Sequence, residues 1–508
     1  GNTILNSVKG TVFMEELDKY LLTDSLDENI KTIQDIFCDD ECINLRTFQN
    51  QYNGLKGCIF FIDDMVDIQI VNEYVLKPIL ENKVLMDDTD YITYLSKHII
   101  SLSSLKISSS IKKIVDAIVY GDTVLIVEGC SQVIIISSKG WKTRDIAEPE
   151  SEKVLRGPRE GFIESLADNL TMIRRKIRSK DLKFHRMTVG ERTKTKVCVC
   201  YIDGLVHDET LSYIVDKIEN IYIDGILDVK YIGEFIDDNP FSLFETNNFT
   251  ERPDVVLGRI LEGRIAVLVD GSPSVMTTPT LFAEVFMSND DYYLNYYYSS
   301  IRRILRITGF VVSISIPALY QALVTFHQGT LPTNLLVAIY AARTGVPFPS
   351  VLELSILIII FEVLREAGTR APGSISQSLS IVGALVLGTA AVDARLVSAP
   401  MIIIVGVTAI MGLMLPNISG TLTILRAFLL VLSSLLGLYG YIFGVLAIII
   451  HLFTLRSCSI PFMSNLNTFH MQSIKDTIIR APGWYMRYRP KFMSKDFKRG
   501  SIGGKGDE

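Results

Sequence analysis

The chain has 508 residues, of which 48% are hydrophobic and 21% are charged, and its formal net charge is −6. These averages hide two unlike parts, because residues 307–454 carry only nine charged side chains. This contrast excludes a wholly soluble protein, a disordered chain and a nucleic-acid binder that relies on overall basicity. It predicts a soluble head attached to an α-helical polytopic membrane domain.

Charge is distributed unevenly along the chain, with −13 in the first 306 residues and +6 in residues 455–508. Because an acidic head repels phosphate backbones, nucleic acid is not an expected partner. Basic clusters flank the apolar part on both sides. They are Arg302, Arg303 and Arg306 before it, and Arg487, Arg489, Lys491, Lys495, Lys498 and Arg499 after it. Such flanks tend to stay in the cytoplasm, so we expect cytoplasmic termini and an even number of crossings, unless these charges are merely solvated.

The head contains helical and strand patterns in alternation. After an N-terminal segment (1–25), Ser25-Leu26-Asp27-Glu28 has the form of a capping box that opens a helix. Further helices are expected at 67–76, 110–119, 165–178 and 209–221, with another started by Pro253. Strands are expected at 58–62, 122–127, 132–137, 195–202 and 264–270. This alternation predicts an α/β fold, which the polar stretch 142–152 divides into two subdomains, 26–145 and 146–300.

The sequence of the head has no pattern typical of catalysis or of metal binding. It lacks a Gly-rich phosphate loop, a nucleophile elbow and a metal-spaced His pair. The seven Cys are scattered, and Cys198 and Cys200 would share one face of a strand, where packing is favoured over pairing. We therefore expect no enzyme activity, no cofactor and no metal.

Two arginines surround a Gly-Pro turn in Arg156-Gly157-Pro158-Arg159. A functional interpretation is an anion clamp or a contact between subunits, because Arg binds carboxylates through two parallel hydrogen bonds. The simpler interpretation is a turn whose Arg residues pair with acids of the head. The sequence favours the simpler interpretation.

The membrane domain is expected at 301–455, followed by a basic cytoplasmic tail at 456–508. Residues 307–326 are long enough for one span, with Pro317 as a kink. Further apolar segments are expected at 334–342, 350–363, 378–392, 401–415 and 421–454. The last could be two short crossings or one broken pair, so the count is four to six.

The segment 378–392 is rich in small residues and would be only about 22 Å long as a helix, against a hydrocarbon core of about 30 Å. On a helix, Ser378, Val382, Leu385 and Thr389 lie on one face. One interpretation is a pore lining in which Val382 and Leu385 form an apolar constriction. The other is a packing interface between helices, and spacing alone does not decide between them.

Several charged side chains lie within or beside the apolar segments. They are Glu353, Glu362, Arg365, Glu366, Asp393 and Arg395. Charges at membrane depth often mark ion paths. These lie near predicted helix ends, which favours salt bridges at the membrane surface.

Several motifs resemble those of the A subunits of bacterial spore germinant receptors, the GerA family. In the head these are 156–162, 251–254, 263–270 and 288–293. In the apolar part they are 326–329 with 331–332, 346–349, 364–368 and 381–388. The resemblance covers nearly the whole chain beyond about residue 120.

The resemblance implies a multi-pass protein of the spore inner membrane, surrounded by membrane lipid. It implies work alongside a transporter-like B subunit and a lipoprotein C subunit, and a homo-oligomeric ring, a pentamer, that conducts cations. In that picture the B subunit binds the germinant and this chain is the channel, which favours the pore interpretation of 378–392.

Two alternatives stay open. One is a secondary transporter, although no inverted repeat relates 307–380 to 381–454. The other is a non-conducting membrane scaffold whose head senses a ligand.

Overall fold

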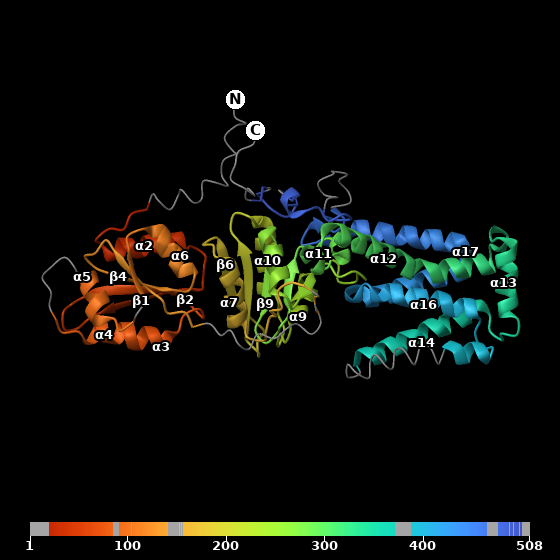
Figure 1. Ribbon diagram of the computed structural model, residues 1–508, viewed down its shortest axis with the longest axis horizontal. Coiled ribbons are helices and arrows are strands. Elements are labelled where there is room, and N and C mark those ends of the chain that lie inside the picture. The colour runs from red at the N-terminus through yellow and green to blue at the C-terminus, as the bar shows by residue number, and fades with distance from the viewer. Residues whose placement is uncertain are drawn as a thin grey trace, which may run out of the picture.

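The computed structural model describes residues 20–84, 91–102, 104–140, 152, 154, 156–370, 388–464, 476–486, 488–490, 492–496 and 498–499. The molecule is elongated, with the α/β head at one end and a bundle of apolar helices at the other (Figure 1). The head consists of two five-stranded sheets with their helices, so the expected α/β class is confirmed for this part.

The first sheet has the order β1-β2-β4-β5-β3, and its recorded strand pairs are all antiparallel. Its strands are β1 (Ile43–Gln49), β2 (Lys56–Ile62), β3 (Leu105–Ser108), β4 (Thr123–Val127) and β5 (Val133–Ile136). Its helices are α2 (Leu26–Ile36), α3 (Ile68–Val71), η2 (Asn72–Leu76), α4 (Lys77–Glu81), α5 (Tyr91–Tyr94), η3 (Leu95–Ile99) and α6 (Ile111–Val119). The expected strands at 58–62, 122–127 and 132–137 are the three central ones, β2, β4 and β5.

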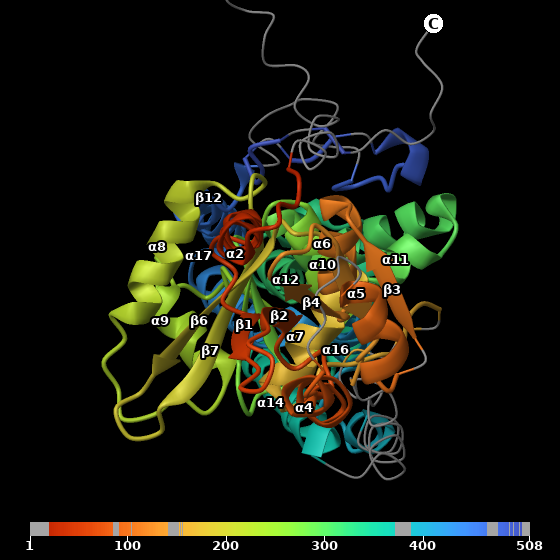
Figure 2. The ribbon, with the colours of Figure 1, turned by 90° about the vertical axis from the view of Figure 1, so that its left-hand side faces the viewer.

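The second sheet repeats this design with the order β6-β7-β9-β10-β8, again antiparallel. Its strands are β6 (Leu182–Val189), β7 (Thr195–Ile202), β8 (Asn248–Thr250), β9 (Ile265–Val269) and β10 (Val275–Thr278). Its helices are α7 (Leu166–Lys176), α8 (Asp208–Glu219), α9 (Val229–Ile236) and α10 (Pro253–Leu261). Seen along the long axis, α8 and α9 lie on one side of the molecule and α11 lies on the other (Figure 2).

Alternation along the strands distributes side chains between separate cores. Phe60 packs with α2 and α6, whereas its neighbour Ile59 packs on the opposite face with η2 and α4. The core on the Phe60 side continues into the second subdomain, where it includes the fully buried Cys198 and Cys200. A buried ion pair between Arg174 and Asp40 (2.5 Å) also joins the two subdomains. The two halves of the head therefore share one core.

The apolar part begins after a short helix, α11 (Asp290–Tyr293). Its helices are α12 (Tyr296–Thr325), α13 (Thr333–Arg343), α14 (Ser350–Arg370), a short helix at 388–393, α16 (Ala399–Leu413) and α17 (Ser419–Thr454). α12 starts eleven residues before the expected span and runs as one helix through Pro317. Among the described residues, two helical stretches, Tyr296–Thr325 and Pro416–Thr454, are long and apolar enough to cross a membrane.

A glycine divides α17 into two arms, 419–436 and 438–454. Gly437 has φ +62°, in the left-handed region that a side chain disfavours. A Cβ at Gly440 would overlap the carbonyl oxygen of Leu432, so the second arm folds back closely on the first. The 36-residue element is therefore a hairpin of two short helices, and the number of crossings stays a prediction.

Candidate functional site at the junction of the head and the apolar helices

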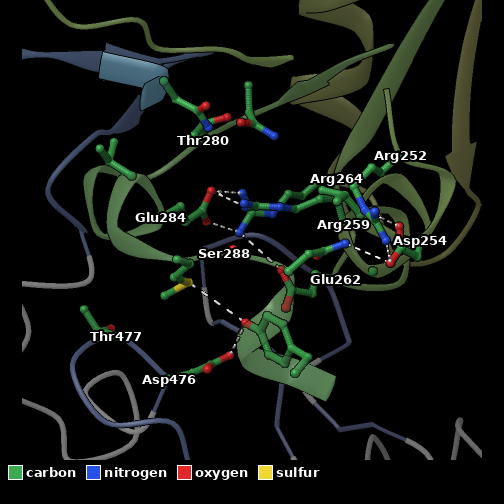
Figure 3. A pocket seen from close by; sticks show the side chains of 18 of the residues that line it. Arg252, Asp254, Arg259, Glu262, Arg264, Thr280, Glu284, Ser288, Asp476 and Thr477 are labelled. Carbon is green, nitrogen blue, oxygen red and sulfur yellow. Dashed lines mark hydrogen bonds and ion pairs between the residues drawn. The ribbon is translucent and has the colours of Figure 1, made fainter. Parts of the chain in front are cut away.

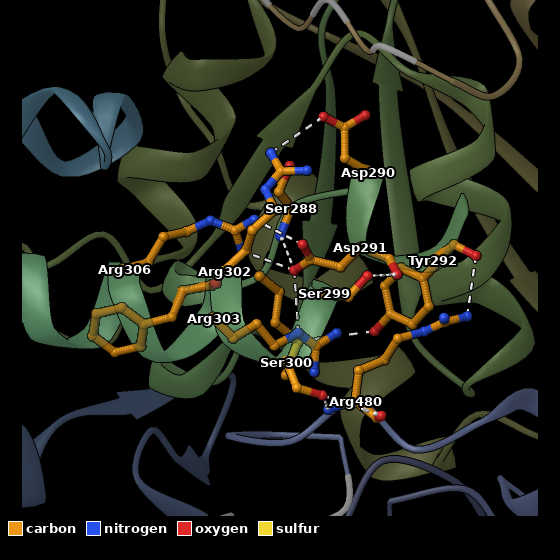
Figure 4. Close-up of polar contacts among 12 residues, drawn as sticks. Ser288, Asp290, Asp291, Tyr292, Ser299, Ser300, Arg302, Arg303, Arg306 and Arg480 are labelled. Atoms are coloured by element: carbon orange, nitrogen blue, oxygen red, sulfur yellow. Dashed lines mark hydrogen bonds and ion pairs between the residues drawn. The ribbon is translucent and has the colours of Figure 1, made fainter. Parts of the chain in front are cut away.

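A buried carboxylate, Asp291, ties the end of the head to the first long helix (Figure 4). It accepts hydrogen bonds from Arg303 Nε (3.1 Å) and from Arg306 Nη1 and Nη2 (2.8 and 2.7 Å). The two arginines are three residues apart on α12 and therefore share one face. Arg306 also donates to the Phe286 carbonyl (2.7 Å), so it holds both α11 and the chain just before α11.

This cluster changes the interpretation of the basic flank before the apolar part. Arg303 and Arg306 are 0% and 7% exposed, so both are buried in ion pairs. The idea that these charges are merely solvated is therefore wrong for Arg303 and Arg306, because they are buried and bonded to Asp291 and the Phe286 carbonyl. Burial alone would raise the pKa of Asp291, but Arg306 and Arg303 outweigh it and hold the pKa below its usual value.

A segment near the C-terminus joins the same cluster. Arg303 Nη1 donates to Asp476 Oδ1 (2.9 Å), and the Tyr292 hydroxyl donates to Asp476 Oδ2 (3.0 Å). Arg480 donates to the carbonyls of Leu294 (3.0 Å) and Tyr292 (3.1 Å). The junction therefore holds three parts of the chain together: the end of the head, the start of α12 and the C-terminal segment.

A second ionic cluster lies between the sheet and the junction (Figure 3). Glu284, in the turn η4 (Phe282–Phe286), pairs with Arg259 of α10 and with Arg264 next to β9. Arg264 also donates to the Pro279 carbonyl (2.8 Å). Burial alone would raise the pKa of Glu284, but Arg259 and Arg264 hold it below its usual value. These contacts fix the chain that leads from β10 to α12 against the sheet.

A cavity of about 1460 Å³ lies beside these clusters, between α10, η4 and the loop 414–418. Its wall includes the ion pairs Arg252–Asp254 and Arg264–Glu284, both drawn in Figure 3. Because the wall carries charges of both signs in matched pairs, it favours no single ligand charge. We therefore interpret the cavity as part of the joint between head and helices.

The Arg156–Arg159 turn packs against this junction through its glycine and proline. Gly157 has φ +125°, and a Cβ there would lie 2.7 Å from the Tyr293 ring. Arg252 donates to the Pro158 carbonyl (2.8 Å). Arg156 and Arg159 are both exposed, and their role in anion binding or subunit contact stays a prediction.

The structure describes only part of the expected pore segment. Ser378, Val382 and Leu385 lie outside the described residues. Thr389 lies on the short helix at 388–393 and is exposed. Its assignment as a pore residue stays a prediction.

The expected intramembrane charges fall into three groups. Glu353 is buried, and its Oε1 accepts from the backbone N–H and the hydroxyl of Ser398 (both 2.6 Å), at the start of α16. Its Oε2 lies 3.8 Å from Arg343 Nε. Within α14, the ion pairs are Glu362–Arg365 and Glu366–Arg370. Asp393 and Arg395 are exposed, and the ion-path role of all six charges stays a prediction.

The sequence interpretation missed Asp291 and Glu284 as members of a site. Asp291 lies in the motif 288–293, whose sequence resembles the family but gives no sign of burial. The spacing of Arg303 and Arg306 on one helical face was the available signal, because two cations on a buried face require a buried acid.

An α/β head joined through buried ion pairs to long apolar helices is the architecture of a membrane-associated protein. The Bacillus/Clostridium GerA spore germination protein model matches residues 25–492. The chain therefore belongs to the GerA family, as its motifs predicted.

The chain is similar to several known proteins. Spore germination protein KA of Bacillus subtilis is 37% identical over 94% of this chain and 88% of its own length. The uncharacterized membrane protein YfkQ of the same organism is 39% identical over 87% of this chain and 86% of its own. The crystal structure of the N-terminal domain of the A subunit of the Bacillus megaterium spore germinant receptor GerK3 is 32% identical. It covers 52% of this chain and 98% of its own, with a TM-score of 0.42.

Proposed function

We propose that this chain is the A subunit of a nutrient germinant receptor in the spore inner membrane and that it forms an ion channel. The family match carries the proposal, because it spans both the head and the apolar helices. In this proposal a ring of copies, a pentamer, surrounds the pore. The ring releases cations when a germinant binds the transporter-like B subunit, and a lipoprotein C subunit completes the complex.

The path of the described helices supports a multi-pass domain in which the described chain begins and ends on the head side. α12 leads away from the head, and Thr325 at its end lies near Ser350 at the start of α14 (3.3 Å between hydroxyl oxygens). α14 leads back, and its Arg365 reaches Thr423 at the start of α17 (3.5 Å). At 21 residues α14 is about 31 Å long, enough for the hydrocarbon core. The α17 hairpin adds two further passes.

The same path supports the proposal that 378–392 lines the pore. α14 ends on the head side, whereas α16 begins on the far side, where Ser398 bonds to Glu353 at the start of α14. We propose that the connection between the two helices crosses the membrane and that its apolar stretch, 378–392, is the part that does so. We assign the constriction to Val382 and Leu385 because apolar rings gate by excluding water.

Potassium efflux from liposomes that contain the purified chain tests this proposal. Val382→Ala should raise efflux above the original chain, because it widens the apolar ring. Val431→Ala is the matched control, since it removes the same atoms from an exposed position on α17 and should leave efflux unchanged. Absence of efflux from every variant, with an intact oligomeric ring, would move conduction to a partner and leave this chain as a scaffold.

A further inference from the structure

Pro317 removes one backbone donor from the middle of α12. Each helical N–H bonds to the carbonyl four residues earlier, and proline has no N–H. The carbonyl of Ser313 therefore lacks its helical partner. Ser313 is fully buried, and in an apolar bundle no bulk water replaces the missing donor.

Arg426 of α17 supplies a donor at this position. Its Nε donates to the Ser313 carbonyl oxygen (3.2 Å), and its Nη2 donates to the Ser313 hydroxyl (2.8 Å). Arg426 is 5% exposed, so both bonds are made away from solvent. One guanidinium thus satisfies the carbonyl released by the proline and also holds the side chain of the same residue.

The two hydrogen bonds to Ser313 are the main interactions that stabilise the buried Arg426 side chain. In the part of the chain that the structure describes, all recorded hydrogen bonds of Arg426 go to Ser313. The nearby Glu362 pairs instead with Arg365. Burying a cation without a paired carboxylate lowers the stability of the fold, so a buried Arg426 needs other hydrogen-bond partners. Gly412 of α16 lies beside the group, since a Cβ there would be in ordinary van der Waals contact with Arg426 Nη2, at 3.5 Å.

We propose that Arg426 is a positioning residue that replaces the backbone donor lost at Pro317 and fixes α12 to α17 at that turn. α12 begins at the Asp291 cluster and ends beside Gly437, where Phe326 and His327 pack against the α17 hairpin. Fixing α12 to α17 at Pro317 therefore keeps the two ends of α12, at the head-side junction and at the far end of the bundle, in constant positions relative to α17. Any effect on ion release rests on the proposed channel, whereas the contact itself does not.

A double-mutant cycle on the purified full chain tests the inference through its thermal unfolding midpoint. Arg426→Met removes both donors and should lower the midpoint by several degrees. Pro317→Ala restores the N–H that bonds to Ser313, so in that background Arg426→Met should lower the midpoint by less than half as much. Pro400→Ala is the matched control, because Pro400 lies in the first turn of α16, where the N–H has no helical partner. Pro400→Ala should not reduce the loss in midpoint that Arg426→Met causes.

Equal losses from Arg426→Met with and without Pro317→Ala would overturn the inference, and so would equal relief from Pro400→Ala. If Arg426→Met does not fold, Arg426→Lys is used in its place. This variant keeps the charge but can donate to one Ser313 acceptor at a time, so it should lower the midpoint by less than Arg426→Met. Pro317→Ala should again reduce that loss. Efflux measured on the same variants separates this result from the channel proposal. A cycle that couples in stability, while neither these variants nor Val382→Ala conduct as an intact oligomeric ring, would support the contact and refute the channel.

Discussion

Replacing Asp291 by Asn should loosen the head from the apolar helices. The change keeps the shape of the side chain but leaves the buried Arg303 and Arg306 without the carboxylate that both share. Breaking a buried ion pair from one side costs about 3–5 kcal/mol, because the remaining charge stays desolvated. Arg303 keeps Asp476 (2.9 Å) and Arg306 keeps the Phe286 carbonyl, so we expect the lower end, about 3 kcal/mol.

The neighbouring Asp290 provides a matched control. Its side chain is also buried (10% exposed), but it has a single, longer ion pair, 3.5 Å from the partly exposed Arg302, for which we expect about 1 kcal/mol or less. For an unfolding unit of 150–250 residues, each kcal/mol shifts the thermal midpoint by about 2–4 °C. Asp291→Asn should therefore lower the midpoint by roughly 6–12 °C, and Asp290→Asn by about 4 °C or less.

The assay is thermal unfolding of the purified full chain in detergent, followed by intrinsic fluorescence, with both variants measured side by side. Limited proteolysis adds a structural readout, because a loosened junction should expose the chain near α11 to cleavage only in Asp291→Asn. Equal midpoints for the two variants would refute the reasoning, since they would show that the Asp291 cluster does not hold the head to α12.

Two further predictions concern acid and the hairpin. The folded-state pKa values of Asp291 and Glu284 lie below those of unfolded carboxyls, about 4, so their stabilisation is present above that pH and is lost as the pH falls through the folded values. The thermal unfolding midpoint should therefore decrease as the pH is lowered below about 4, and the decrease should be smaller for Asp291→Asn. A thermal midpoint that does not change down to pH 3 would contradict this. Gly440→Ala should cost about 1–3 kcal/mol or more in thermal unfolding, because its Cβ overlaps the Leu432 carbonyl. Gly420→Ala, in open space on the same helix, should be neutral or stabilising, and similar losses from both would contradict the close hairpin.

The junction gives the family architecture a physical route between its two parts. The sheet of the second subdomain is tied to η4 through Glu284, and η4 and α11 are tied to α12 through Arg306. A displacement of the head therefore acts directly on the first long helix. This route is independent of which segment lines the pore.

Local sequence patterns predicted the central strands of both sheets, except β10. β2, β4, β5, β7 and β9 are apolar runs because helices or the other subdomain cover both of their faces. The edge strands β1, β3, β6 and β8 were missed, since half-exposed strands mix polar and apolar residues. β10, at four residues with two threonines, is too short to give a clear pattern.

The sequence by itself also determined the division into a charged head and an apolar part, the proline within α12 and the family. Each of these depends on composition, on neighbouring residues or on short motifs. The partners of the buried charges were decided only by the tertiary structure. Arg426 meets Ser313 from 113 residues away, and Arg303 meets Asp476 from 173 residues away. No local pattern encodes such a pairing, because which charges share a buried space depends on how helices distant in the chain pack against one another.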